Sequence, residues 1–118
     1  SDLMSGLREI AGINVLSTVV EGADAKSLRD VADQVRSKID RGAFLLVAVD
    51  DDRAALLVGV TNNLTDRIKA GDLLKHVAAQ MGGKGGGRPD MAQGAATDIS
   101  ALPEALESVY SWVETNLS

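Results

Sequence analysis

Hydrophobic and polar positions along the chain predict three strands and three helices. The first apolar stretch, INVLSTVVEG (13–22), is rich in β-branched residues and stops at a glycine, which is typical of a strand. AFLLVAV (43–49) and AALLVGV (54–60) flank the acidic tetrapeptide DDDR, so together they predict a β-hairpin. These runs are too uniformly apolar for a sheet with one solvated face, so we expect helices to cover at least part of it.

Apolar residues recur at helical spacing in the remaining stretches. Segment 24–42 has one apolar face and ends at Gly42, a residue that fits the position just after a helix. Segment 72–81 has an apolar stripe that stops at Gly82. Segment 102–117 has another stripe, and Pro103 suits its first turn because the missing N–H costs nothing there. TDRI (65–68) predicts a single helical turn.

The order is β-α-β-β-α-(glycine loop)-α, which predicts an α/β fold with a mixed β-sheet flanked by helices. The stretch from 82 to 98 is irregular, with a short extended segment expected near 91–96. Leu3, Leu7 and Ile10 share a helical face, so residues 1–10 are interpreted as the end of an upstream helical or linker segment. Residues 11–118 are then one globular domain.

Composition limits the possible chemistry. The chain has 118 residues and only three aromatic side chains, so its core must be aliphatic. It has no cysteine and one histidine, His76, so we expect no metal site. No apolar run reaches the length of a membrane span, and no signal-peptide pattern occurs, so we expect a cytoplasmic protein without a membrane partner.

The net charge of −5 argues against nucleic acid, and we expect no DNA partner, but the charge is unevenly distributed. Residues 1–60 hold seven bases and ten acids, and residues 91–118 hold four acids and no base. Residues 61–90 hold five bases against three acids, and a local basic patch of this kind can bind a polyanion. The five bases are Arg67, Lys69, Lys75, Lys84 and Arg88.

The basic stretch contains the glycine-rich segment MGGKGGGRPDMAQ (81–93). A run of backbone N–H groups without side chains can form a nest for an anion, and Lys84 and Arg88 add charge at its two edges. A tightly turned connector between two helices is the alternative. Neither a P-loop nor a dinucleotide fingerprint fits, because both need a strand before the glycines and here a helix precedes them.

For the other candidate residues, a structural role is the alternative to a functional one. The acidic run DDD (50–52) suits a solvated hairpin turn better than a metal site, and His76 suits a satisfied polar position better than a nucleic-acid contact. Tyr110 and Trp112 suit partial burial against the sheet rather than base stacking. No nucleophile–base set stands out, so we expect no catalytic residue here.

The string GGKGGGRPDMAQ (82–93), followed by small residues, TD and a final amphipathic helix, closely resembles the C-terminal (DHHA1-type) domain of alanyl-tRNA synthetase. SLRDVADQVRSKI (27–39), the block from 56 to 93, and ALPEALESVYSWV (101–113) extend this resemblance over essentially the whole chain. One departure is QGAA (93–96), where the family usually reads Gln-Ala-Gly-Gly. In related phosphoesterases a histidine follows three glycines, whereas Arg88 stands here; arginine can hold an anion but is a poor proton donor.

The resemblance implies that the parent protein is an alanine–tRNA ligase and that this fragment is non-catalytic. Aminoacylation of tRNA(Ala) with ATP and editing of mischarged tRNA would then belong to upstream domains, together with Mg and Zn. The fragment would contact the tRNA elbow and help to assemble a homodimer through the adjoining helical segment.

The loop residues expected to bind tRNA are Lys84, Gly85, Gly86, Gly87, Arg88, Asp90 and Gln93. Additional candidate contacts are Arg67, Lys69 and Lys75. Asp90 and Gln93 either orient the loop or touch the ligand. The alternatives left open are the substrate-binding domain of a DHH-type phosphoesterase and a pure dimerisation module.

Overall fold

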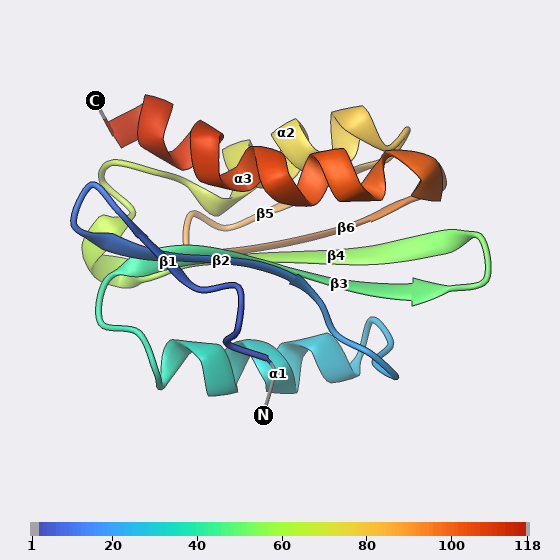
Figure 1. Cartoon of the computed structure of the whole chain (residues 1–118), viewed down its shortest axis with the longest axis horizontal. Helices are drawn as coiled ribbons and strands as arrows, with labels where there is room; N and C mark the ends of the chain where they lie inside the picture. The colour runs from blue at the N-terminus through green and yellow to red at the C-terminus, as the bar shows by residue number, and fades with distance from the viewer. Residues whose placement is uncertain (1–2, 118) are drawn as a thin grey trace.

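The computed structural model describes residues 3–117, which form three layers with one β-sheet between two helical layers (Figure 1). Helix α1 (Ser27–Arg36) covers one face of the sheet, and α2 (Ala70–Gln80) and α3 (Leu102–Leu117) cover the other. The strands are β1 (Arg8–Ile10), β2 (Ile13–Val19), β3 (Gly42–Asp50), β4 (Arg53–Val60), β5 (Lys84–Gly87) and β6 (Met91–Ala96). Short 3-10 turns span Asn62–Leu64 and Ile99–Ala101.

The sheet is mixed, with the strand order β1-β2-β3-β4-β6-β5. β2 and β3 run parallel and are connected through α1, whereas the other neighbouring strands are antiparallel. The predicted α/β fold with a mixed, helix-flanked sheet is therefore confirmed. So are the predicted hairpin, which pairs Asp50 with Arg53, and the extended segment near 91–96, which is β6.

The central strands are apolar throughout because both of their faces are covered. On the α1 side, Phe44, Leu46 and Leu57 are fully buried in one cluster with the apolar stripe of α1. On the opposite side, Leu45 and Val58 are fully buried in a larger cluster with α2 and α3. Side chains on both faces of β3 are therefore covered by helices from Ala43 to Ala48, and only the end of the strand, Val49 and Asp50, is exposed.

The helix expected at the start of the chain is absent from the described part of it. Residues 3–6 form a turn and Arg8–Ile10 form β1, while residues 1–2 lie outside the described residues. Ala11 (φ 53°) and Gly12 (φ 84°) make a two-residue turn between Ile10 and Ile13. Positive φ at both turn positions matches the twist of a hairpin, so this pair determines the local fold, and the helical spacing of the preceding apolar residues was misleading.

Gly42 has a different role from the predicted one. Helix α1 ends at Arg36, and Gly42 is the first residue of β3 rather than the residue after a helix. A Cβ at Gly42 would lie 1.9 Å from the carbonyl oxygen of Asn14. Glycine is therefore required because β2 and β3 approach closely at this point.

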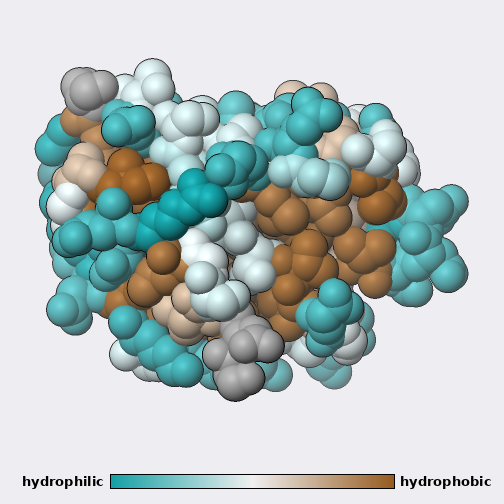
Figure 2. All heavy atoms as spheres, in the orientation of Figure 1, coloured by the Kyte–Doolittle hydropathy of each residue, from teal (hydrophilic) through white to brown (hydrophobic). Residues whose placement is uncertain are grey.

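Tyr110 of α3 covers the edge of β2 where β1 has ended. The backbone N–H of Ser17 donates to the Tyr110 hydroxyl at 3.2 Å, and that hydroxyl donates to the Gly6 carbonyl at 2.7 Å. Arg8 lies 3.8 Å from the Tyr110 ring centroid and forms an ion pair with Glu107. Apolar side chains also reach the surface along this edge, between the helical layers (Figure 2). Tyr110 thus occupies the place of a strand partner at an edge that could otherwise pair with other chains.

Replacing Tyr110 with Phe should lower the free energy of unfolding by about 1–2 kcal/mol, because the Ser17 N–H and the Gly6 carbonyl lose their partner while the ring stays. Urea denaturation of the two proteins measures the difference. Ser111→Ala, on the exposed side of the same helix, is the control and should change little. Equal stability of Y110F and the parent would show that the hydroxyl does not protect the edge.

Candidate nucleic-acid interface

The glycine-rich segment is an edge strand rather than a loop. Lys84–Gly87 form β5, which is exposed along its whole length and pairs with β6 at the end of the sheet. The Arg88 N–H donates to the Met91 carbonyl at 2.8 Å. Because hydrogen-bonded and non-hydrogen-bonded pairs alternate in an antiparallel ladder, Gly86 bonds to β6, and the N–H and C=O groups of Gly85 and Gly87 face the open edge. Part of the expected nest of free N–H groups is therefore used by the sheet.

Three glycines of the segment are required by the packing of β5 on β6. A Cβ at Gly83 would lie 2.2 Å from the Ala95 carbonyl oxygen, at Gly85 2.4 Å from that of Gln93, and at Gly87 2.5 Å from that of Met91. Gly86 differs, since a Cβ there would have no atom within 4 Å. The fold therefore explains glycine at these three positions, and a φ of 64° explains it at Gly82, whereas Gly86 has neither explanation.

A hollow of about 210 Å³ separates β5 from the start of α2, and we call it the α2-side hollow. The Ala70 N–H donates to the Pro89 carbonyl at 2.8 Å, which joins the helix start to the turn after β5. The positive end of the helix dipole and two lysines favour an anion in this hollow. Its lining residues are Lys69, Gly71, Asp72, Lys75, Gly86, Gly87, Arg88 and Pro89.

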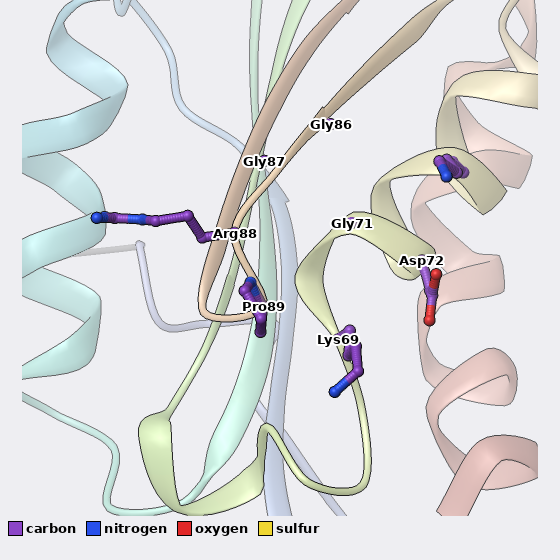
Figure 3. Close-up of a pocket in the computed structure, with 8 residues that line it drawn as sticks. Lys69, Gly71, Asp72, Gly86, Gly87, Arg88 and Pro89 are labelled. Carbon is purple, nitrogen blue, oxygen red and sulfur yellow. The ribbon is translucent and has the colours of Figure 1, made fainter.

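A second hollow of about 360 Å³ lies on the other side of β5, and we call it the α1-side hollow. Arg29 of α1 donates to the Gln93 side-chain oxygen from Nε at 3.0 Å and from Nη2 at 2.7 Å. The Arg88 side chain extends from the end of β5 toward α1 and away from Lys69 (Figure 3). The lining residues are Arg29, Gly86, Gly87, Arg88, Met91 and Gln93.

Asp90 orients the turn between β5 and β6. Its carbonyl accepts the Val60 N–H at 2.9 Å and a hydrogen bond from Arg36 Nη2. Its carboxylate lies 3.6 Å from Arg88 Nε, although the Arg88 side chain remains 77% exposed. Of the two roles considered for Asp90, the contacts within the chain support orientation of the turn.

The structure brings most of the candidate residues together. Gly86, Gly87 and Arg88 line both hollows, Lys69 and Lys75 line the α2-side hollow, and Gln93 lines the α1-side hollow. Lys84 is exposed at the start of β5 and lines neither. Arg67 lies apart, where its Nη2 donates to the Leu117 carbonyl at 2.8 Å.

Two arginines of the interface were not singled out from the sequence. Arg29 and Arg36 belong to α1, and their partners Gln93 and Asp90 are 64 and 54 positions away in the chain. The helix pattern shows only that these arginines lie off its apolar stripe. Nothing local in the sequence indicates that α1 lies beside β6.

His76 lies between α2 and α3 rather than at the interface. Its Nε2 is 3.0 Å from the Ser108 hydroxyl, and its ring centroid is 6.0 Å from that of Trp112. Burial lowers the pKa of His76 below its ordinary value. The interpretation of His76 as a satisfied polar residue agrees with these contacts, and Trp112 packs toward α2.

The acidic run Asp50–Asp52 closes the β3–β4 hairpin, as predicted. Within residues 3–117, no group of three or more His, Cys, Asp or Glu side chains could hold a metal ion. No helix in the same range is long and apolar enough to cross a membrane.

The three-layer fold with its glycine-rich edge strand is that of a known domain class. Residues 12–115 match the model of the DHHA1 domain, and the chain belongs to this family. Three curated relatives are each named alanine–tRNA ligase. They are 52% identical over 111 residues (Saccharophagus degradans), 51% over 114 (Hydrogenovibrio crunogenus) and 50% over 116 (Chromohalobacter salexigens). The matches cover 94%, 97% and 98% of this chain, which spans only 13% of each relative's length.

Solved structures share the fold. The C-Ala domain from Aquifex aeolicus alanyl-tRNA synthetase has a TM-score of 0.84 at 23% identity, over 92% of this chain and 97% of that one. A DHH-domain member of the S1P family of ribosomal proteins has a TM-score of 0.60 at 15% identity, over 95% of this chain and 28% of that one. At these identities the likeness shows the fold alone.

Alanine substitutions at two neighbouring glycines should have different effects on stability. Gly85→Ala places a methyl group against the β6 backbone and should lower the free energy of unfolding by about 1–3 kcal/mol. Gly86→Ala places it in open space and should change stability by less than about 0.5 kcal/mol. Urea denaturation of both variants checks this, and an equal loss in the two would contradict the described packing of β5.

Proposed function

We propose that this chain is the C-terminal domain of an alanine–tRNA ligase and that it binds tRNA through β5 and the two hollows beside it. The observation that supports this most directly is the identity of 50–52%, over nearly the whole chain, with relatives named alanine–tRNA ligase. The fold of the Aquifex aeolicus C-Ala domain agrees with it.

The geometry of the edge suits a nucleic-acid backbone. β5 has no side chain between Lys84 and Arg88, so a bulky polyanion can approach its backbone closely. Lysines border one side of the strand and arginines the other. Outward-facing amides and cations suit phosphates and riboses more than base edges, so contact with the tRNA elbow would depend on shape.

The local charge explains how a protein with a net charge of −5 can bind RNA. The residues lining the two hollows include four cations and a single acid, Asp72. The acids of the β3–β4 hairpin lie at the opposite end of β4 from the β5–β6 turn. A cationic edge on an acidic molecule also orients the approach of a polyanion.

Under this proposal, the whole protein attaches alanine to tRNA(Ala) with ATP and edits mischarged tRNA through other domains, which would also hold Mg and Zn. The present chain is proposed to be non-catalytic. Its Ser108–His76 contact supports this, because the serine hydroxyl donates to the Ala105 carbonyl at 2.7 Å rather than being free to give its proton to the imidazole. The cytoplasm is the proposed location, and assembly into a homodimer through an adjoining helical segment is a further part of the proposal.

Arg88→Ala should weaken tRNA binding and reduce the steepness of log K against log salt by roughly 0.7–0.9, the value for one phosphate contact on DNA. The fold should survive, since the side chain is mostly exposed. Filter binding at several salt concentrations measures both quantities. Arg53→Ala, at the β3–β4 hairpin, is the matched control and should bind as the parent does. Equal binding and an equal slope for R88A and R53A would contradict the assignment of the interface.

A further inference from the structure

The two hollows beside β5 differ in their chemistry. In the α2-side hollow, the lysines share the lining with Asp72, and Lys69 Nζ already donates to the Thr65 carbonyl at 3.1 Å. The α1-side hollow has two arginines and no acid among its lining residues. Arginine binds phosphate oxygens in pairs through its planar fork, which an ammonium group cannot do.

Resting on the proposed function, we propose that the α1-side hollow is a distinct phosphate subsite, in which Arg29 and Arg88 bind one phosphodiester group of the RNA over Gly86. Both arginines and Gly86 line this hollow. Arg29 comes from α1, outside the glycine-rich segment, so the subsite joins two elements that are far apart in sequence. It gives Arg29 the role of a binding residue.

The hydrogen-bonding groups of the subsite select for an acceptor. The side-chain oxygen of Gln93 accepts both hydrogen bonds from Arg29, which leaves its NH₂ group to face a ligand as a donor. Arg29 Nη1 has no acceptor among the described residues, and the Arg88 guanidinium can only donate. The free side-chain groups are therefore donors, and a phosphodiester, which offers only acceptor oxygens, complements them.

The glycine at position 86 supports the phosphate subsite independently of the hydrogen-bond donors. The fold would accept a side chain at this position, because a Cβ there meets nothing within 4 Å and no positive φ demands glycine. Gly86 and Gln93 are paired across β5 and β6, and both line the α1-side hollow. Packing does not require this glycine. Because it has no side chain, the floor of the hollow stays open, and a phosphate can approach the backbone closely.

Gln93 acts as a positioning residue for Arg29. Two hydrogen bonds to one oxygen hold the guanidinium against the sheet, although the residue is exposed on α1. A side chain held in place before binding loses less conformational entropy when the ligand arrives. The same contact restrains Arg29 beside Gly86, where the proposed phosphate lies.

The test compares the parent chain with Arg29→Ala, Arg29→Lys and the control Arg53→Ala in tRNA filter binding over a range of salt concentrations. Arg29→Ala should weaken binding by about threefold to tenfold and lower the salt slope by roughly 0.7–0.9. Arg29→Lys keeps the charge, so it should keep the slope while losing part of the affinity, because a lysine cannot donate to Gln93 and a phosphate in the same fork. Gly86→Val should weaken binding without changing the slope, since it blocks the floor and removes no charge.

Urea denaturation of each variant separates binding from folding. All five variants, with Arg88→Ala included, should unfold at the same urea concentration as the parent. If Arg29→Ala binds as the parent does while Arg88→Ala is weakened, the subsite is wrong and the proposed tRNA function stands. If neither variant changes binding, or the parent does not bind tRNA, the proposed function fails as well. If Arg29→Lys lowers the slope of log K against log salt as Arg29→Ala does, the subsite is also wrong, because a retained charge at position 29 would then not retain the phosphate contact.

Discussion

The close approach of β5 to β6 is the constraint from which the geometry of the interface follows. Carbonyl oxygens of β6 occupy the positions that Cβ atoms would take at Gly83, Gly85 and Gly87. Glycine is therefore required at these three positions, and β5 ends the sheet as a thin, exposed edge. Because Gly85, Gly86 and Gly87 have no side chains, the space on both sides of this edge stays open, and charged groups from neighbouring elements can border it.

Those groups are placed by contacts to backbone and side-chain oxygens rather than by the glycine segment itself. The helix start of α2 is held to Pro89, and Arg36 of α1 binds the carbonyls of Val60 and Asp90. Arg36 also lies 5.5 Å from the centroid of the buried Phe44 ring, so its position is fixed by the core. The turn that carries Arg88 is thus connected to both helical layers. A rigid support of this kind lets an exposed edge keep a defined shape.

Much of the fold could be predicted from local patterns, because the central strands are continuous apolar runs and α3 has strong apolar periodicity. The start of the chain could not, since the turn at Ala11 and Gly12 depends on two positive φ angles that the helical spacing of Leu3 and Ile10 does not reveal. Gly42 was assigned to a helix end because a glycine looks the same in sequence whether it supplies a turn or a close strand contact.

The residue types of the candidate site could be predicted from the sequence, but its secondary structure and its contact with α1 could not. The bases and glycines of residues 61–90 indicated an anion site, and Lys69, Lys75 and Arg88 do border the same strand. That this segment is a strand depends on β6, whose sequence of small residues has weak strand propensity. Arg29 was missed because only the tertiary fold brings α1 beside Gln93.

The central claim is that RNA contacts β5 from both sides, and a titration of the ¹⁵N-labelled chain with tRNA, followed by two-dimensional NMR, tests it most directly. We expect the largest changes in amide signals at Gly86, Gly87 and Arg88, with a change in the Arg29 side-chain Nε signal at the same tRNA concentrations. Changes confined to the β1–β2 edge around Arg8, with none along β5, would contradict the claim.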